Sequence, residues 1–270
     1  MKVFPNVKLN LGLRVIRRRP DGYHDIETLF VPYDGYSDEL QIERSDRFSL
    51  VIDGQHYQGW DVAGDLTARA WKLLADECGI DPVSMRLTKN APVGAGLGGG
   101  SADAAFALRA LDALFGLGLG DAALAAFAAR LGSDCPFFIY NRPMLASGRG
   151  EVLEPFDIDL SGYRIEVAVP EGVAVSTREA YAGLKLGSER EETASEGGMP
   201  LGGSLLQLSK ILKHPVAEWR DLLVNDFERS VFPAHPEIAA LKESFYNRGA
   251  AYSAMSGSGS AVFALFPLNP

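Results

Sequence analysis

Residues 92–105 read PVGAGLGGGSADAA, a glycine-rich loop that runs directly into a predicted amphipathic helix. Five glycines fall within the seven residues 94–100. Glycine tolerates positive φ and lets the backbone approach a ligand closely, so several N–H groups can point at one anion. The first turn of the following helix adds free N–H groups and the positive end of the helix dipole. The stretch therefore predicts a phosphate site at the start of a helix.

Loops of this kind occur in several classes of nucleotide-binding protein. Gly94, Gly96 and Gly99 match the spacing of the dinucleotide fingerprint, but that fingerprint follows a buried parallel strand. Here residues 83–89 alternate like a half-exposed strand, and a second helix follows the first. The glycines precede no Lys-Ser or Lys-Thr pair, and the sequence lacks the His-Arg-Asp and Asp-Phe-Gly signatures of protein kinases. A dinucleotide dehydrogenase, a P-loop enzyme and a protein kinase are therefore disfavoured.

The composition narrows the possible partners. The chain has 270 residues, 47% of them hydrophobic, and a formal net charge of −9. This charge disfavours binding to nucleic acid or an anionic membrane, which needs a basic face. Two cysteines favour a reducing compartment, and four scattered histidines give no metal-ligand spacing, so we predict no metal site built by a protein cluster. No apolar run reaches the roughly 18 residues of a membrane span. We expect a cytoplasmic protein that acts on small molecules.

The N-terminal segment predicts a strand and a turn. Residues 7–16 alternate apolar and polar side chains, which puts Lys8 and Asn10 on the same side, where a solvated strand face is the simplest interpretation. Three arginines and a Pro-Asp-Gly turn follow, and then Tyr23 and His24 begin the next predicted strand. Helices are expected over 65–77, 101–115 and 121–131. Ser101 and Asp103, at the start of the second of these helices, suit its exposed N–H groups.

The C-terminal half continues the mixed pattern. Asp134 precedes an apolar run, as a turn or helix-capping residue would. A strand over 163–170 and helices over 204–213, 216–227 and 236–245 are expected, and the polar segment 187–203 reads as a mobile loop. A second glycine motif, MSGSG at 255–259, lies between two predicted strands, where a Gly-Ser hairpin would be sufficient explanation.

In their order along the chain, these segments resemble the GHMP kinase superfamily of small-molecule kinases. The superfamily's three motifs correspond to the strand that contains Lys8, the 92–105 loop and the MSGSG motif. The segments RRPDGYH at 18–24, GSDCPFF at 132–138 and NDFE at 225–228 resemble one branch in particular. Its members phosphorylate the 2-hydroxyl of 4-diphosphocytidyl-2-C-methyl-D-erythritol in non-mevalonate isoprenoid precursor biosynthesis. The resemblance spans nearly the whole chain.

The resemblance implies an α+β fold of two domains. Residues 1–150 would form the N-terminal ATP-binding and catalytic domain, with a ribosomal-protein-S5-like α/β fold. Residues 151–270 would form the C-terminal GHMP kinase domain, with a ferredoxin-like α+β fold. The mixed order of strands and helices, without sustained βαβ alternation, independently favours the α+β class.

The resemblance also implies the roles of individual residues. Asp134 would accept the proton of the substrate hydroxyl, and the ammonium of Lys8 would keep that carboxylate ionised and neutralise charge during phosphoryl transfer. Tyr23, His24 and Tyr181 would hold the cytosine by stacking and hydrogen bonding, and Asn10 would contact the sugar alcohol. The residues expected to bind ATP are Lys89, Pro92, Val93, Gly94, Ala95, Gly96, Leu97, Gly98, Gly99, Gly100, Ser101 and Ala102. Ser101 would help to hold the phosphates or Mg²⁺, so the expected cofactors are ATP and Mg²⁺.

Two departures and two alternatives remain open. Asp65 stands where relatives often carry an asparagine near adenine, and an ionised carboxylate cannot donate as an amide does. The segment 187–203 looks longer than its family counterpart. The alternatives are another small-molecule kinase of the superfamily, acting on mevalonate or homoserine, and a non-catalytic nucleotide sensor. The sequence leaves the oligomeric state open.

Overall fold

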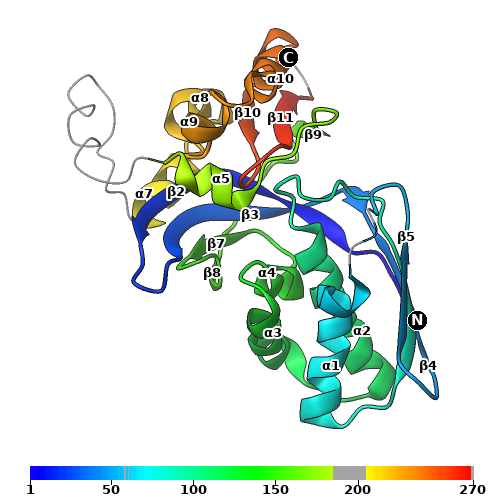
Figure 1. Cartoon of the computed structure of the whole chain (residues 1–270). Helices are drawn as coiled ribbons and strands as arrows, with labels where there is room; N and C mark the ends of the chain where they lie inside the picture. The colour runs from blue at the N-terminus through cyan, green and yellow to red at the C-terminus, as the bar shows by residue number, and fades with distance from the viewer. Residues whose placement is uncertain (58, 60, 185–204, 269–270) are drawn as a thin grey trace. The chain divides into compact units, whose positions relative to one another are not determined.

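The computed structural model in Figure 1 describes residues 1–57, 59, 61–184 and 205–268. The segment 187–203, expected to be a loop, lies outside these residues. The chain forms two compact units that are interleaved along the sequence. Unit 1 consists of Met1–Lys8, Pro32–Val93 and Leu97–Arg142, and unit 2 of Leu9–Val31, Gly94–Gly96 and Pro143–Pro270. Because the units are interleaved, the expected division near residue 150 stays a prediction about sequence domains.

Unit 1 contains a four-stranded sheet. Its order is β1 (Lys2–Val3), β4 (Glu39–Arg44), β6 (Val83–Thr88), β5 (Ser49–Asp53). β4 and β6 are antiparallel, and β5 is parallel to β6. Along β6 the side chains of Met85 and Leu87 are buried whereas Arg86 is exposed, which is the pattern of a half-exposed strand that the sequence predicts.

The helices of unit 1 pack around α2 (Gly99–Phe115). α2 contacts α1 (Leu66–Cys78), α3 (Gly120–Leu131), α4 (Cys135–Tyr140) and β4 (Figure 1). A short 3₁₀ turn, η1 (Val62–Gly64), precedes α1. α2 is rich in alanine, and Ala104, Leu108 and Leu111 are fully buried, so neighbouring helices approach it closely on several sides. This packing fixes the position of the N-terminal turn of α2, where the glycine loop ends.

Unit 2 contains two further sheets. One has the order β2 (Asn6–Arg18), β3 (His24–Ser37), β7 (Met144–Ser147), β8 (Val152–Pro155), and both β2 and β3 continue into residues of unit 1. The other has the order β10 (Tyr252–Met255), β11 (Val262–Pro267), β9 (Tyr163–Ala168) and is antiparallel throughout. The strands expected at the two ends of the MSGSG motif are therefore β10 and β11.

The helices of unit 2 are mostly short. They are α5 (Thr177–Ala182), α7 (Leu205–Ile211), the 3₁₀ turn η3 (Val216–Glu218), α8 (Trp219–Leu222), α9 (Glu228–Val231) and α10 (Pro236–Asn247). α10 packs on β10 and β11, and Phe245 belongs to the buried core there. In the described residues, no helix combines the length and apolarity needed to cross a membrane.

The prediction of one continuous helix over 216–227 is wrong. The helical turns end at Leu223, and the backbone then runs beside β2. The N–H of Leu13 donates to the carbonyl of Val224 at 2.9 Å, and the N–H of Asp226 donates to the carbonyl of Leu13 at 2.7 Å. Hydrogen bonding to a distant strand therefore replaces the helical bonds that the local sequence favours.

Candidate active site

The glycine loop has the backbone conformation that its sequence predicts. Gly94, Gly96 and Gly98 have φ values of 71°, 78° and 75°. Gly98 is the N-cap residue of α2, and a Cβ on it would lie 3.2 Å from Cε of Lys8 and 3.2 Å from the ring of Phe138. Because Gly98 has no side chain, it cannot cap the N–H groups of the first turn of α2. The start of α2 is thus formed for close approach by an anion.

The MSGSG motif packs against residues 94–96 of the loop. The hydroxyl of Ser256 donates to the carbonyl of Gly96 at 3.1 Å, and the N–H of Ala261 donates to the carbonyl of Ala95 at 3.0 Å. The side-chain amide of Asn225 donates to the carbonyls of Met255 and Gly257, each at 2.8 Å. Ser256 of the motif and Ala261, two residues after it, therefore hold the first half of the glycine loop, which a Gly-Ser hairpin alone would not explain.

Lys8 and Asp134 form an ion pair near Gly98. The ammonium of Lys8 lies 3.7 Å from a carboxylate oxygen of Asp134, and their side chains are 4% and 32% exposed. Burial lowers the pKa of Lys8, and the charge of Asp134 acts against that shift. Asp134 lies in a turn at the N-cap position of α4, as its sequence context predicts, but its side chain makes no capping hydrogen bond. A partly exposed carboxylate is thus held beside a buried cation.

Lys89 lies in a buried cluster of charges. Its ammonium contacts carboxylate oxygens of Asp38 and Asp103, and all three side chains are almost fully buried. The expected role of Asp103 at the exposed N–H groups of α2 is wrong, since its carboxylate turns inward to Lys89. Burial alone would lower the pKa of Lys89, but the charges of Asp103 and Asp38 raise it. Sequence reasoning missed Asp38, which lies between two strands and has no local signal apart from that of a turn residue.

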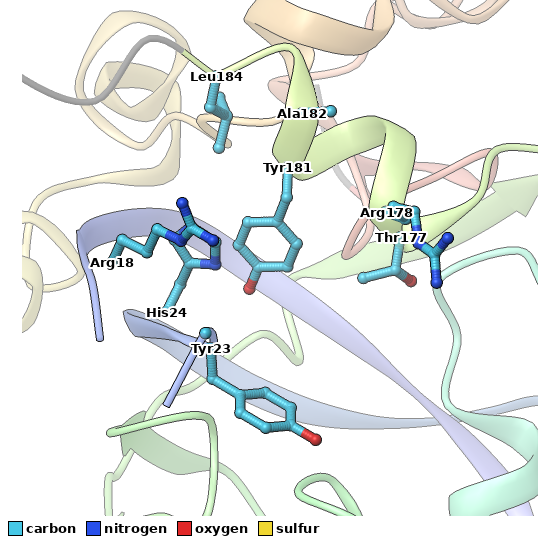
Figure 2. A pocket seen from close by; sticks show the side chains of 9 residues that line it. Arg18, Tyr23, His24, Thr177, Arg178, Tyr181, Ala182 and Leu184 are labelled. Atoms are coloured by element: carbon cyan, nitrogen blue, oxygen red, sulfur yellow. The ribbon is translucent and has the colours of Figure 1, made fainter. Parts of the chain in front are cut away.

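A cavity of about 920 Å³ brings together three of the predicted substrate residues, Tyr23, His24 and Tyr181 (Figure 2). The rings of His24 and Tyr181 stack on each other, with centroids 4.2 Å apart and planes 13° from parallel. Tyr23 is 56% exposed, and the guanidinium of Arg149 lies over its ring at 4.9 Å. The remaining lining residues are Arg18, Gly22, Thr177, Arg178, Ala182 and Leu184. This volume is within the range of small-molecule sites.

The three consecutive arginines have different surroundings. Arg17 and Arg19 both pair with Asp25, at 2.6 and 2.8 Å, and Arg19 also pairs with Asp21. Arg18 lines the cavity and forms no ion pair within the described residues.

Burial, followed by the positive charge of Arg18, lowers the pKa of His24. A neutral His24 can both donate and accept a hydrogen bond.

The other predicted site residues have identifiable partners. Asn10 is 1% exposed, and its side-chain amide donates to the hydroxyl of Thr28 at 3.1 Å. Asp65 caps α1 by accepting the N–H of Thr67 at 2.8 Å, which is a structural use of the carboxylate at this departure from the family pattern. Ser101 lies in the first turn of α2, half-buried, and interacts with the thiol of Cys135. Among the residues that the structure describes, no three His, Cys, Asp or Glu side chains form a metal-binding group.

Comparison with known proteins gives similarity along nearly the whole chain. The family model described as GHMP kinases N terminal domain matches residues 65–142, and GHMP kinases C terminal matches residues 208–269. The 4-diphosphocytidyl-2-C-methyl-D-erythritol kinase of Bacteroides fragilis is 42% identical, and the comparison covers 98% of this chain and 92% of the relative. The protein of the same name from Parabacteroides distasonis is 44% identical, with 98% and 92% covered.

The fold is similar to that of a solved structure with the same activity in its name. The crystal structure of 4-(cytidine 5'-diphospho)-2C-methyl-D-erythritol kinase superposes with a TM-score of 0.78 at 33% identity. The superposition covers 98% of this chain and 90% of that one.

Proposed function

The chain belongs to the 4-diphosphocytidyl-2-C-methyl-D-erythritol kinases of the GHMP kinase superfamily, and we propose that Lys8 and Asp134 carry out its phosphoryl transfer. It is an ATP-dependent kinase of a small molecule in the non-mevalonate isoprenoid pathway. The observation that carries the proposal is the ion pair of Lys8 and Asp134, with an oxygen–nitrogen distance of 3.7 Å, beside Gly98 at the start of α2.

The two residues have complementary roles in the proposed reaction. Asp134 accepts the proton of the 2-hydroxyl of the methylerythritol unit as that oxygen attacks the γ-phosphorus of ATP. The buried ammonium of Lys8 pairs with this carboxylate and stabilises negative charge on the transferred phosphoryl group. Because Lys8 is 3% exposed, water screens its charge little, and the electrostatic effect on the transition state is correspondingly strong. Asn10, two residues after Lys8 in β2, contacts the sugar alcohol.

The glycine loop holds the phosphates of ATP. Positive φ at Gly94, Gly96 and Gly98 and the uncapped first turn of α2 support this role for residues 92–102. The hydroxyl of Ser101, in the first turn of α2, would be a suitable oxygen ligand for Mg²⁺. When bound, Mg²⁺ would neutralise charge on the transferring group.

The cavity at His24 and Tyr181 holds the cytidine end of the acceptor. Aromatic rings favour a base through its π-face, and neutral His24 selects cytosine by hydrogen bonding to its edge. Tyr23 contributes from the rim of the same cavity. Arg18 and Arg178, which also line it and have no carboxylate partner in the described residues, favour an acceptor that carries negative charge.

We also infer the domain boundaries and the cellular location of the protein. The matched segments 65–142 and 208–269 fall on either side of residue 150, which supports the division into domains 1–150 and 151–270. Both cysteines are free in the structure, which supports the cytoplasm as the location.

An ADP-release assay with three acceptors tests the proposed function. We expect turnover with 4-diphosphocytidyl-2-C-methyl-D-erythritol, the cytidyl conjugate, and none above background with mevalonate or homoserine. Comparable kcat/KM for mevalonate or homoserine would contradict the assigned acceptor. Binding of ATP without turnover of any of the three would favour a nucleotide sensor.

A further inference from the structure

Three charged side chains are buried together behind the glycine loop. The side chains of Lys89, Asp38 and Asp103 are 3%, 1% and 3% exposed, and the ammonium contacts both carboxylates. With both carboxylates ionised, the cluster carries a net negative charge. Removing three charges from water is costly, and such clusters are not a general source of stability.

Asp38 connects three parts of unit 1. One of its oxygens accepts the N–H groups of Asn90 and Ala91, at 2.6 and 2.8 Å, in the segment that leads into the glycine loop. Its own N–H donates to the carbonyl of Pro5 at 2.9 Å, directly before the strand that contains Lys8. Its other oxygen contacts Lys89, at the end of β6. Asp38 thus joins the segments that precede the phosphate loop and the proposed catalytic strand.

Lys89 extends this connection to α2. Its ammonium contacts Asp103 of the second turn, and a Cβ on Gly99 would lie 3.6 Å from that ammonium and 3.7 Å from an oxygen of Asp38. The cluster is therefore packed directly against the first residue of α2. The N–H of Lys89 also donates to the carbonyl of Asp53 at 2.8 Å, which anchors its backbone to β5. The base of the loop is held from the protein interior.

We propose that Asp38, Lys89 and Asp103 form a positioning cluster that fixes the N-terminal turn of α2 for nucleotide binding, and that Lys89 acts through the two carboxylates instead of touching the phosphates. This inference rests on the proposed binding of ATP at the glycine loop. An ammonium has three donors, and this one is enclosed by two acidic partners with 3% of its side chain exposed. Reaching a phosphate would require it to leave both carboxylates buried without a cation.

The proposal gives the members of the cluster unequal importance. Loss of Lys89 leaves two carboxylates facing each other in the interior, which displaces the segments that they hold. Burial and the charge of Asp38 raise the pKa of Asp103, and its second oxygen has no hydrogen-bond partner in the described residues. Asp103→Asn keeps the shape and removes the excess charge, so it is expected to be tolerated far better than Lys89→Met.

Nucleotide affinity in a set of variants tests the proposal. The probe is a non-hydrolysable ATP analogue with Mg²⁺, titrated by calorimetry into the full chain. Lys89→Met is expected to weaken binding more than tenfold, and Asp103→Asn less than threefold. Steady-state KM for the cytidyl conjugate should stay unchanged in both. The control is Lys72→Met, which removes a lysine whose ion pair with Asp76 is exposed on α1.

The decisive variant is the neutral triple, in which Lys89→Met is combined with Asp38→Asn and Asp103→Asn. If the cluster acts by positioning α2, the triple variant recovers most of the affinity lost in Lys89→Met, because no unpaired charge is left. Contact between Lys89 and phosphate predicts no recovery, since the ammonium is still missing, and that result would overturn the proposal. If Lys89→Met fails to fold, comparison of the triple variant with the wild type gives the same decision. A wild-type chain that binds no analogue would instead overturn the proposed function itself.

Discussion

Replacing Gly96 by alanine tests the close packing of the glycine loop on the MSGSG motif. Gly96 has φ of 78°, and a Cβ on it would clash with the carbonyl oxygen of Ser256 and lie 3.0 Å from the nitrogen of Gly259. The left-handed conformation costs an alanine about 1–2 kcal/mol. The clash adds about 1–3 kcal/mol, because both neighbours are backbone atoms that cannot rotate away. The total of about 2–5 kcal/mol is a large part of the stability of an ordinary domain.

Two other glycines of the loop serve as matched controls. Gly94 also has positive φ, but a Cβ there would meet nothing within 4 Å in the described structure, so Gly94→Ala isolates the conformational cost. Gly100 lies inside α2, where a Cβ would likewise be unobstructed, and alanine there is expected to be neutral or stabilising by up to about 1 kcal/mol. The measurements are urea unfolding and the KM for ATP. Equal destabilisation by Gly96→Ala and Gly94→Ala would refute the packing argument.

Two further predictions concern the acceptor cavity. Burial and the charge of Arg18 lower the pKa of His24 below its usual value of 6.5. His24 therefore stays neutral until the pH falls through that lowered pKa. The KM for the cytidyl conjugate should rise only when the pH falls into that range. Arg18→Gln should move this rise to higher pH, and an unchanged pH profile of KM would contradict the assignment. Arg178→Gln should raise the KM for the conjugate about tenfold, through loss of a charge-assisted hydrogen bond. Arg17→Gln, which removes a guanidinium already paired with Asp25, should leave KM unchanged, and equal effects of the two variants would exclude a specific role for Arg178.

Features determined by local sequence could be predicted well. The glycine spacing predicts the loop conformation, because positive φ is a property of single residues. Apolar periodicity predicts α1, α2, α3 and α10 to within a few residues, because apolar side chains recur at helical spacing in each of them. The resemblance to GHMP kinases brought together Lys8 and Asp134, which are 126 positions apart in sequence and paired in the structure.

Features that depend on distant partners could not be predicted. Asp38 is a buried anion only because Lys89 approaches it from another strand, and the same residue types are common in exposed turns. The three arginines at 17–19 are the same residue type, and what distinguishes Arg17 and Arg19 from Arg18 is their pairing with Asp25 and, for Arg19, also with Asp21. The helical pattern of 216–227 is interrupted because β2 supplies alternative hydrogen bonds.

Phosphoryl transfer in the proposed reaction depends on Asp134 as the base for the acceptor hydroxyl. The measurement is the single-turnover rate of phosphoryl transfer from ATP to the cytidyl conjugate, for the wild type and for Asp134→Asn, with both substrates saturating. Asparagine keeps the shape of the side chain but cannot accept the proton, so the rate is expected to fall by about 10²–10⁴ while the affinity for ATP is retained. A single-turnover rate for Asp134→Asn equal to that of the wild type would contradict the central claim.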